Sequence, residues 1–520
     1  MYDERSPLLK DAESQKSRSL GISRLLAGLV GVFLAGADKS VLLTTQNQIA
    51  SSLQSPYSAP LLLVSYNLGF CVALPVYGFL SDIYGSRNFL LLSYALFSVG
   101  CAISGAVDSL WPFAFGRLLA GIGGSGMTDL LSVLINGREF LFNERHQADH
   151  ALETFDVKEI ASVRSWVIAA EIFGQGCGGP LGGIITDKIG WRWALLGQVP
   201  IGFLCLILAH WQLPQTPKKT DVKSKVTLWS FDYLGLAAFV TSTTAFVLAT
   251  TDGSPTLDAN KPALFCTWGI FLILLIVVEK FSPRPIFPAS LVTAPGLRNV
   301  FLGQFAFFAN VSIVMNTLPS YLSQIEQMTS SQIALRIWPS CLGLVLGAMI
   351  AGRALRTTVQ YRRISLIGTV ITVASLLVMV VRWMDGIQGV EVFYGFPWAL
   401  GCGMLLSAQF LALTNWSPED QMANATAIYC LAQQIGQIVG TSGSTAALQQ
   451  LFRLRLGANL TGTPNSTKII QKILQNYWYI EELPHALRRV VQFSYIEAFR
   501  LVPALSTTMA VITGIIVSFT

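Results

Sequence analysis

Long apolar runs, separated by short polar segments, fill the chain from residue 24 to its end. A helix that crosses a membrane needs about 20 consecutive and mostly apolar residues. Runs of this length recur along the chain, and glycine, proline or clustered charge marks the breaks between them. We therefore expect an all-α polytopic membrane protein with 14 transmembrane helices, near residues 24–45, 59–80, 88–107, 111–135, 163–184, 193–212, 231–250, 263–281, 297–321, 332–352, 363–383, 391–413, 424–448 and 501–519.

Composition supports a membrane setting and excludes other classes. Hydrophobic residues make up 52% of the chain and charged residues only 12%, against about 25% charged in a typical soluble domain. The net charge of +6 fits basic cytoplasmic loops and does not call for nucleic acid. Eight scattered cysteines without a C-x-x-C pair predict neither disulfides nor a metal site. The polar segments hold no nucleophile–base set, metal spacing or phosphate loop, so we expect neither an enzyme nor a cofactor.

The placement of Lys and Arg predicts the orientation. With the N-terminus in the cytosol, the short loops on that side hold basic residues such as Arg87, Arg138 and Arg362, whereas the loop at 46–58 on the opposite side holds none. The first residues are polar and lack the apolar core of a signal peptide. Residues 1–23 are therefore expected to form a cytosolic tail.

The tail and a loop near the C-terminus carry two possible cellular signals. Glu4 precedes the pair Leu8–Leu9 in the manner of an acidic dileucine sorting signal, which an adaptor would read on the route to a lysosome or vacuole; a chance match is an equal alternative. Asn459 and Asn465 begin N-x-[ST] sequons, which predict glycosylation on a luminal or extracellular face.

The stretch from Glu171 to Trp193 is apolar yet crowded with glycine around Pro180. In a soluble helix each interior glycine costs about 1 kcal/mol and a proline about 3 kcal/mol. In a membrane, small residues let two helix backbones touch, and neighbouring groups satisfy the carbonyl that proline frees. We expect a helix pressed against another one, with a hinge made by Gly174, Gly178, Gly179, Pro180, Gly182 and Gly183.

Two further motifs indicate a family. The segment from Gly78 to Arg87 lies between two predicted spans and resembles the GxLaDrxGrk motif of the major facilitator superfamily. The segment from Arg117 to Gly123 resembles the RxxxGxG pattern of the same superfamily. The first resemblance implies a cytoplasmic gate that latches the two halves shut, formed by Gly78, Asp82, Gly85 and Arg87.

Ionisable residues inside predicted spans are costly and therefore point to function. The resemblance associates Arg117 with proton coupling, while an arginine that snorkels to the interface is the alternative. Asp38 lies near mid-membrane in the first span. An aspartate at that depth must be paired or protonated, and both states suit a proton carrier. The adjacent Lys39 departs from the family pattern. We expect proton coupling by Asp38 and Arg117.

A cationic substrate needs counter-charges in the central cavity. Asp38, Asp129 and Glu171 are the acidic candidates, although a protonated Glu171 bonded to a neighbouring helix is an alternative for that residue. The second half is poor in acids, and Gln433 stands where relatives often carry arginine. The candidate polar residues that line the cavity there are Asn310, Asn316, Gln409 and Gln434.

The glycine stretch resembles the antiporter motif of the fifth helix, and GGPLGG followed by GWRW is similar to the fungal vacuolar basic amino-acid transporters and their multidrug-exporting relatives. This resemblance implies two six-helix halves with an inserted helix pair and alternating access. The implied division is a tail at 1–23, an N-terminal half at 24–212, a basic linker and helix pair at 213–296, and a C-terminal half at 297–520 with a luminal loop at about 450–500.

The implied function is proton-coupled transport of lysine, arginine or histidine into the vacuole by a monomer in the vacuolar membrane. The first alternative is a multidrug–proton antiporter at the plasma membrane. A non-transporting receptor built on the same fold is the second alternative, because Lys39 and Gln433 depart from the family pattern.

Overall fold

The computed structural model describes residues 6–53, 59–136, 157–212, 232–250, 255–282, 285–358, 360–383, 393–418, 421–460 and 484–519. Within these residues the chain is almost wholly helical and forms no strand. Glu4, Asn465 and most of the basic linker lie outside the described residues.

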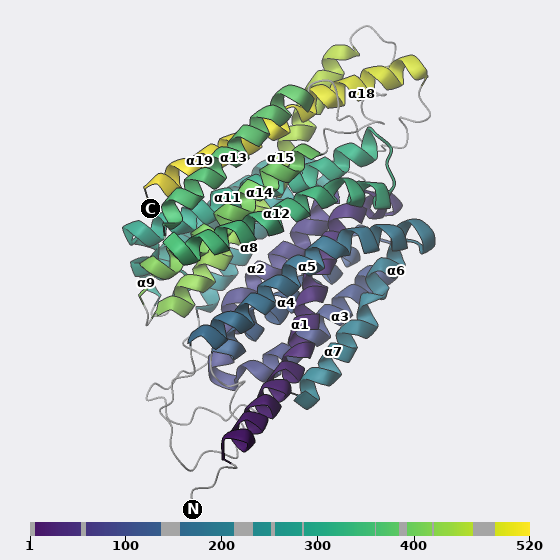
Figure 1. Cartoon of the computed structure of the whole chain (residues 1–520). Coiled ribbons are helices and arrows are strands. Elements are labelled where there is room, and N and C mark those ends of the chain that lie inside the picture. Colours follow the sequence, from purple (N-terminus) through teal and green to yellow (C-terminus); the bar gives the residue numbers. More distant parts are fainter. Residues whose placement is uncertain are drawn as a thin grey trace, which may run out of the picture.

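The helices form a bundle of long, roughly parallel rods (Figure 1). The first group, which builds the N-terminal half, comprises α1 (Ser6–Ser52), α2 (Ala59–Tyr84), α3 (Ser86–Ala106), α4 (Leu110–Asn136), α5 (Val157–Ile189), α6 (Trp191–Leu196) and α7 (Gln198–Gln212). A helix pair follows, made of α8 (Tyr233–Thr250) and α9 (Pro255–Phe281). The remaining helices are α10 (Ala289–Thr293), α11 (Pro295–Gln324), α12 (Ser330–Thr358), α13 (Tyr361–Arg382), α14 (Gly395–Trp416), α15 (Met422–Asn459), α18 (His485–Phe499) and α19 (Leu501–Ser518).

Each predicted span coincides with helical residues, and 11 helical segments in the described part are long and apolar enough to cross a membrane. Helices α4, α5 and α15 are not among those segments. They are the helices that carry Arg117 and Asp129, Glu171 with its glycines, and a run of glutamines. The same polar residues that make these helices candidates for function therefore lower their apolar character.

The structure differs from the predicted boundaries at both ends of the chain. Helix α1 begins at Ser6, well before the predicted span at 24–45. Helix α15 continues to Asn459, and α18 occupies part of the predicted luminal loop at 450–500. Val491, Tyr495 and Phe499 of α18 are buried in the core of the C-terminal half. Amphipathic α18 was missed because it is shorter and more polar than a span.

Two faces of the bundle follow from the alternating direction of the helices. We call the near face the one where α2 ends and α3 begins, and the far face the one where α1 ends and α2 begins. Both the start of α1 and the end of α19 lie towards the near face (Figure 1). Arg362 donates to the carbonyl of Ser518 at this face, which ties the start of α13 to the end of α19.

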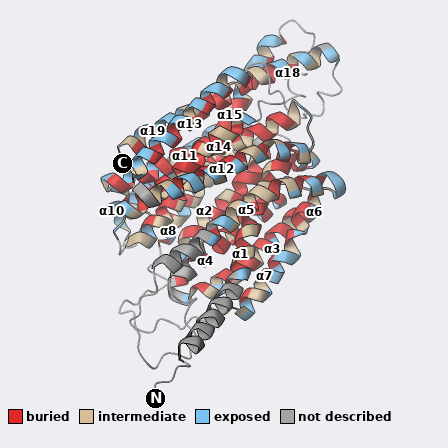
Figure 2. Cartoon of the chain, viewed as in Figure 1, coloured by how far each residue is buried: buried red, intermediate tan, exposed pale blue. Residues whose placement is uncertain are grey.

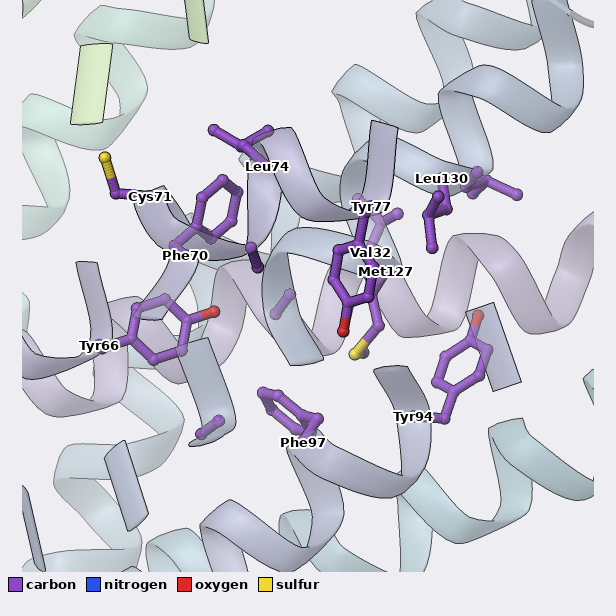
Figure 3. Packing of buried hydrophobic residues seen from close by; sticks show 14 of the residues in the cluster. Val32, Tyr66, Phe70, Cys71, Leu74, Tyr77, Tyr94, Phe97, Met127 and Leu130 are labelled. Atoms are coloured by element: carbon purple, nitrogen blue, oxygen red, sulfur yellow. The ribbon is translucent and has the colours of Figure 1, made fainter. Parts of the chain in front are cut away.

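Buried residues face the interior of the bundle and exposed residues lie on its outer side (Figure 2), and the two largest core clusters lie mainly in one half each. Tyr66, Phe97 and Met127 come from three helices and meet in the core of the N-terminal half (Figure 3). Helix α9 leaves most of its residues exposed, including Ile273 and Ile276. Since every backbone group of a helix is bonded internally, such a surface suits the hydrocarbon of a bilayer.

Candidate substrate and coupling site

A buried ion pair lies at the centre of the N-terminal half. Arg117 of α4 donates from Nη2 to Oδ2 of Asp38 on α1, and both side chains are fully buried. The ring of Tyr66 lies 5.3 Å from the guanidinium carbon of Arg117. The structure thus brings together the two residues predicted to couple protons. It is inconsistent with the alternative in which Arg117 snorkels to the interface, because the side chain has no exposed surface.

Lys39 has a different partner from its neighbour Asp38. Its Nζ lies 3.7 Å from Oε1 of Glu171 on α5, and the two side chains are 18% and 30% exposed. Nζ also lies 4.5 Å from the centre of the Phe70 ring. Adjacent helical residues point about 100° apart, so Asp38 and Lys39 face different helices. Gln175 donates to the same Glu171 oxygen at 3.3 Å.

Asp129 completes a cluster of five charged residues. Ser125, one turn earlier on α4, donates to Oδ2 of Asp129 at 3.1 Å. Glu171 and Lys39 are near enough to interact with Asp129 electrostatically. The cluster therefore holds three acids (Asp38, Asp129, Glu171) and two bases (Lys39, Arg117), a formal sum of −1. A site with this balance favours a cation or a proton.

The glycines of α5 form a seam along α1. A Cβ at Gly174 would meet the carbonyl of Phe33, and one at Gly178 would meet the backbone of Ala37. At Gly179 and Gly182 it would lie 2.9 Å from Ser40 Oγ and 2.7 Å from the Val41 side chain. The expected close approach of two helices is therefore present. A Cβ at Gly183 would instead lie 2.8 Å from the carbonyl of Ser330 on α12, in the other half.

The seam holds the two charged helices at a fixed distance. Helix α5 continues as one helix through Pro180. The role of these glycines and Pro180 as a hinge stays a prediction.

The glycines of α4 have an equivalent packing role, because a Cβ at Gly121 would meet the carbonyl of Tyr66 and one at Gly123 the backbone of Phe97. Motif glycines thus place Arg117 against α2 and α3.

The hydrogen bond of Arg87 in the near-face motif stays within the N-terminal half, and the motif's role as a cytoplasmic gate stays a prediction. Gly85 adopts a φ of 85°, which suits glycine in the tight turn between α2 and α3. Arg87 donates at 2.7 Å to the carbonyl of His210 on α7, within the same half. Gly78 makes no close approach, since a Cβ there would meet nothing within 4 Å. The side chain of Asp82 lies outside the described residues.

Two of the four predicted polar residues of the second half are hydrogen-bonded to a neighbouring helix. Asn310 accepts a hydrogen bond from Ser506 on α19, and Asn316 donates to Thr441 on α15 at 2.7 Å. Gln409 and Gln434 are 3% and 1% exposed, so they do not line an open cavity in this structure. We had not predicted Gln304, which donates to Gln433 at 3.4 Å. Gln304 could have been identified from the sequence, because it is a glutamine inside an apolar run.

The sequon at Asn459 lies at the end of α15. Its side-chain nitrogen donates to Ser494 at 3.0 Å and to Glu497 at 3.4 Å. A glycan would be attached to this same nitrogen, so its attachment would disturb both hydrogen bonds. Glycosylation at Asn459 stays a prediction.

Comparisons with known proteins agree with this architecture. The family model described as Major Facilitator Superfamily matches residues 28–138 and 150–446. Among solved structures, a bacterial homolog to the human lysosomal transporter Spinster, in an inward-facing and unoccupied conformation, has a TM-score of 0.61 at 13% identity and covers 96% of each chain. A D-xylose-proton symporter has a TM-score of 0.58 at 14% identity and covers 95% of this chain and 97% of its own. These likenesses show the fold.

Three fungal proteins are among the curated relatives. "Multidrug resistance protein fnx1" of Schizosaccharomyces pombe is 27% identical, covering 98% of this chain and 94% of its own length. "Vacuolar membrane amino acid uptake transporter fnx2" of the same organism is 24% identical over 94% and 82%. "Vacuolar basic amino acid transporter 2" of Saccharomyces cerevisiae is 26% identical over 84% and 92%. This chain therefore belongs to the Major Facilitator Superfamily, as a multi-pass membrane transporter and not an enzyme.

Proposed function

We propose that the protein is a proton-coupled transporter that moves lysine, arginine or histidine across the vacuolar membrane into the lumen by alternating access. The observation that carries the proposal is the charged cluster of the N-terminal half, which holds one more acid than bases. A charge inside a membrane protein is retained when it pairs or when it carries a substrate or ion. With three acids and two bases, the cluster cannot pair every acid with a base of its own.

Within this mechanism the two ion pairs have separate roles. The Lys39–Glu171 pair is partly exposed and long at 3.7 Å, so a cationic substrate competes with Lys39 for Glu171. The Asp38–Arg117 pair is fully buried. Protonation of Asp38 would release Arg117 and couple proton movement to the packing of α1 against α4. Asn316 on α11 and the glutamines of α14 and α15 would meet the substrate from the opposite half.

Two of the relatives support the compartment and the substrate class, since their names refer to vacuolar amino acid uptake and vacuolar basic amino acids. We place the N-terminus in the cytosol, so that the near face is cytosolic and the far face is luminal. The 14 spans, the inserted helix pair, a sorting adaptor at the tail and a monomeric state are parts of the same proposal.

A second candidate function is a multidrug–proton antiporter at the plasma membrane. The observation that favours it is the relative named for multidrug resistance, which matches 98% of this chain. Another relative with such a name comes from Bacillus subtilis, at 23% identity. The same charged cluster would then accept a cationic drug. A non-transporting member of the fold is the third reading.

The test is uptake of labelled arginine, lysine and histidine into sealed vacuolar vesicles that carry this protein. A proton gradient is imposed and then collapsed with an uncoupler. We expect uptake that appears with the gradient and disappears with it, and that is lost in Glu171→Gln. The matched control is Asp108→Asn, which removes an exposed acid that pairs with Arg192 away from the cluster.

If the folded protein takes up none of the three amino acids, its assignment as a vacuolar transporter of basic amino acids is rejected. The same vesicles would then be loaded with a fluorescent cationic dye to test the second candidate. Gradient-driven dye movement without amino-acid uptake would establish drug transport. Absence of both, from folded protein, would leave the non-transporting reading.

A further inference from the structure

The polar contacts between the two halves gather at the far face. Gln46, near the end of α1, donates to the carbonyl of Asn316 at 3.3 Å, and Asn47 accepts from Ser320 at 3.3 Å. Ser330, the first residue of α12, donates from its hydroxyl to Gln48 at 2.9 Å. All these residues stand at the ends of α1 and α11 or at the start of α12, and so at one side of the membrane.

The strongest of these contacts involves Asp187, in the last turn of α5. Its Oδ1 accepts from the backbone nitrogen of Ser330 at 3.2 Å, and its Oδ2 accepts from that of Ser331 at 2.9 Å. The hydroxyl of Ser331 also donates to Oδ2. One carboxylate thus accepts three hydrogen bonds from the first two residues of α12.

The geometry is that of a helix cap supplied by the other half of the molecule. The first N–H groups of a helix have no partner within the helix, and its N-terminus carries a partial positive charge. A carboxylate that accepts from those groups satisfies them and is attracted to that charge. The capped helix belongs to the C-terminal half, whereas Asp187 belongs to the N-terminal half. Separating the halves at this face breaks the cap.

The backbones also meet at this point. A Cβ at Gly183, one turn before Asp187, would lie 2.8 Å from the carbonyl of Ser330. Asn47, Asn316 and Ser320, which take part in these hydrogen bonds, also line a cavity of about 40 Å³. This is far below the roughly 300 Å³ of a small ligand pocket. This cavity is therefore too small for an amino acid.

We propose that Asp187 is the gate latch of the far face, and that α12 must leave its carboxylate before substrate can pass through that face. The proposal rests on alternating access in the proposed function and adds a residue that controls it. Removing the carboxylate weakens the closed state relative to the far-face-open state. Hydrogen bonds to a charged group typically contribute enough for a shift of about tenfold in the ratio of the two states.

The experiment measures the distance across the far face by double electron–electron resonance in nanodiscs. Spin labels are attached at Ile189→Cys and Glu326→Cys, which are exposed positions flanking the contact. The four cysteines that are exposed or half-buried, Cys177, Cys266, Cys341 and Cys430, are first replaced by serine. We expect Asp187→Ala to shift the population from the short towards the long distance by about tenfold, and Asp187→Asn to shift it less.

The matched control is Asp108→Asn, which removes the same charge from the same face. Asp108 pairs with Arg192 inside the N-terminal half, so its loss breaks no contact between the halves. The proposal is overturned if the distance distribution of folded Asp187→Ala and Asp187→Asn equals that of the parent, or if Asp108→Asn shifts it equally. The measurement uses no substrate. If Asp187→Ala shifts the distances as expected but the parent protein takes up no amino acid, the substrate assignment is rejected and the latch proposal stands.

Discussion

At the scale of single residues, the site depends on burying charge. Asp38 and Arg117 have no exposed surface, and their attraction must offset the cost of removing both ions from water. Lys39 and Glu171 remain partly exposed, so their pair is weaker and easier to exchange. In the proposed mechanism, this difference separates a pair that responds to protonation from a pair that a substrate replaces.

Asp38→Asn is expected to abolish gradient-driven uptake and to destabilise the fold. The variant leaves Arg117 buried without a counter-charge, which costs about 3–5 kcal/mol. The expected loss of stability follows from the buried partner, which the residue pattern alone does not identify. Thermal unfolding in detergent and vesicle uptake are measured together.

The control for Asp38→Asn is the double variant Asp38→Asn with Arg117→Gln, which removes both charges. It should recover most of the lost stability while uptake stays absent. If the double variant or the single one transports at the parent's rate, these residues do not couple protons.

Lys39→Gln is expected to lower the KM for arginine, because it removes the cation that competes for Glu171. A partly exposed pair contributes about 0.2–1 kcal/mol, so KM should fall by no more than roughly fivefold. Initial uptake rates at varied arginine concentration measure this effect. Lys188→Gln, an exposed lysine at the end of α5, is the control. An unchanged KM would mean that Lys39 and substrate occupy different sites.

At the scale of helices, the glycine seam decides how closely α1 and α5 approach. The backbone of Ala37 fills the space where a side chain at Gly178 would stand. Gly176 lies on the same helix, but a Cβ there would meet nothing within 4 Å. Comparing the same substitution at Gly178 and at Gly176 therefore separates the effect of helix packing from that of helix propensity.

Gly178→Ala is expected to destabilise the protein by about 1–3 kcal/mol, because two helix backbones must move apart to admit one methyl group. It should also lower uptake, since α1 carries Asp38 and Lys39. Gly176→Ala should be neutral or stabilise by up to about 1 kcal/mol. Thermal unfolding of both variants tests the pair. Equal behaviour would show that the seam does not determine the spacing.

At the scale of the whole molecule, the tail and the far-face contacts concern where the protein acts and in which state. If the proposed vacuolar sorting is correct, Leu8→Ala with Leu9→Ala is expected to move the protein away from the vacuolar membrane, because the variant removes the leucine pair that a sorting adaptor would read. Fluorescence microscopy of tagged protein measures localisation. Gln15→Ala with Lys16→Ala, in the same tail, is the control. Unchanged localisation of the dileucine variant would identify the motif as a chance match.

Much of the fold was predictable, because an apolar run in a membrane can satisfy its backbone only as a helix or a closed barrel. The runs near 59–80 and 88–107 correspond closely to α2 and α3. The charged residues of the site were also identifiable, since Asp38, Arg117 and Glu171 interrupt apolar stretches. Glycine at regular intervals around Pro180 correctly indicated close contact of α5 with another helix.

The amino-acid sequence by itself determined which segments are helical and which residues are costly to bury, because both follow from local composition. Only the tertiary structure decided the partners. Asp38 and Arg117 are 79 positions apart, and Asp187 and Ser330 are 143 positions apart. Which carboxylate meets which cation depends on how whole helices rotate and pack, and backbone contacts at glycine set that packing. The latch at Asp187 exists only because the two halves meet at the far face.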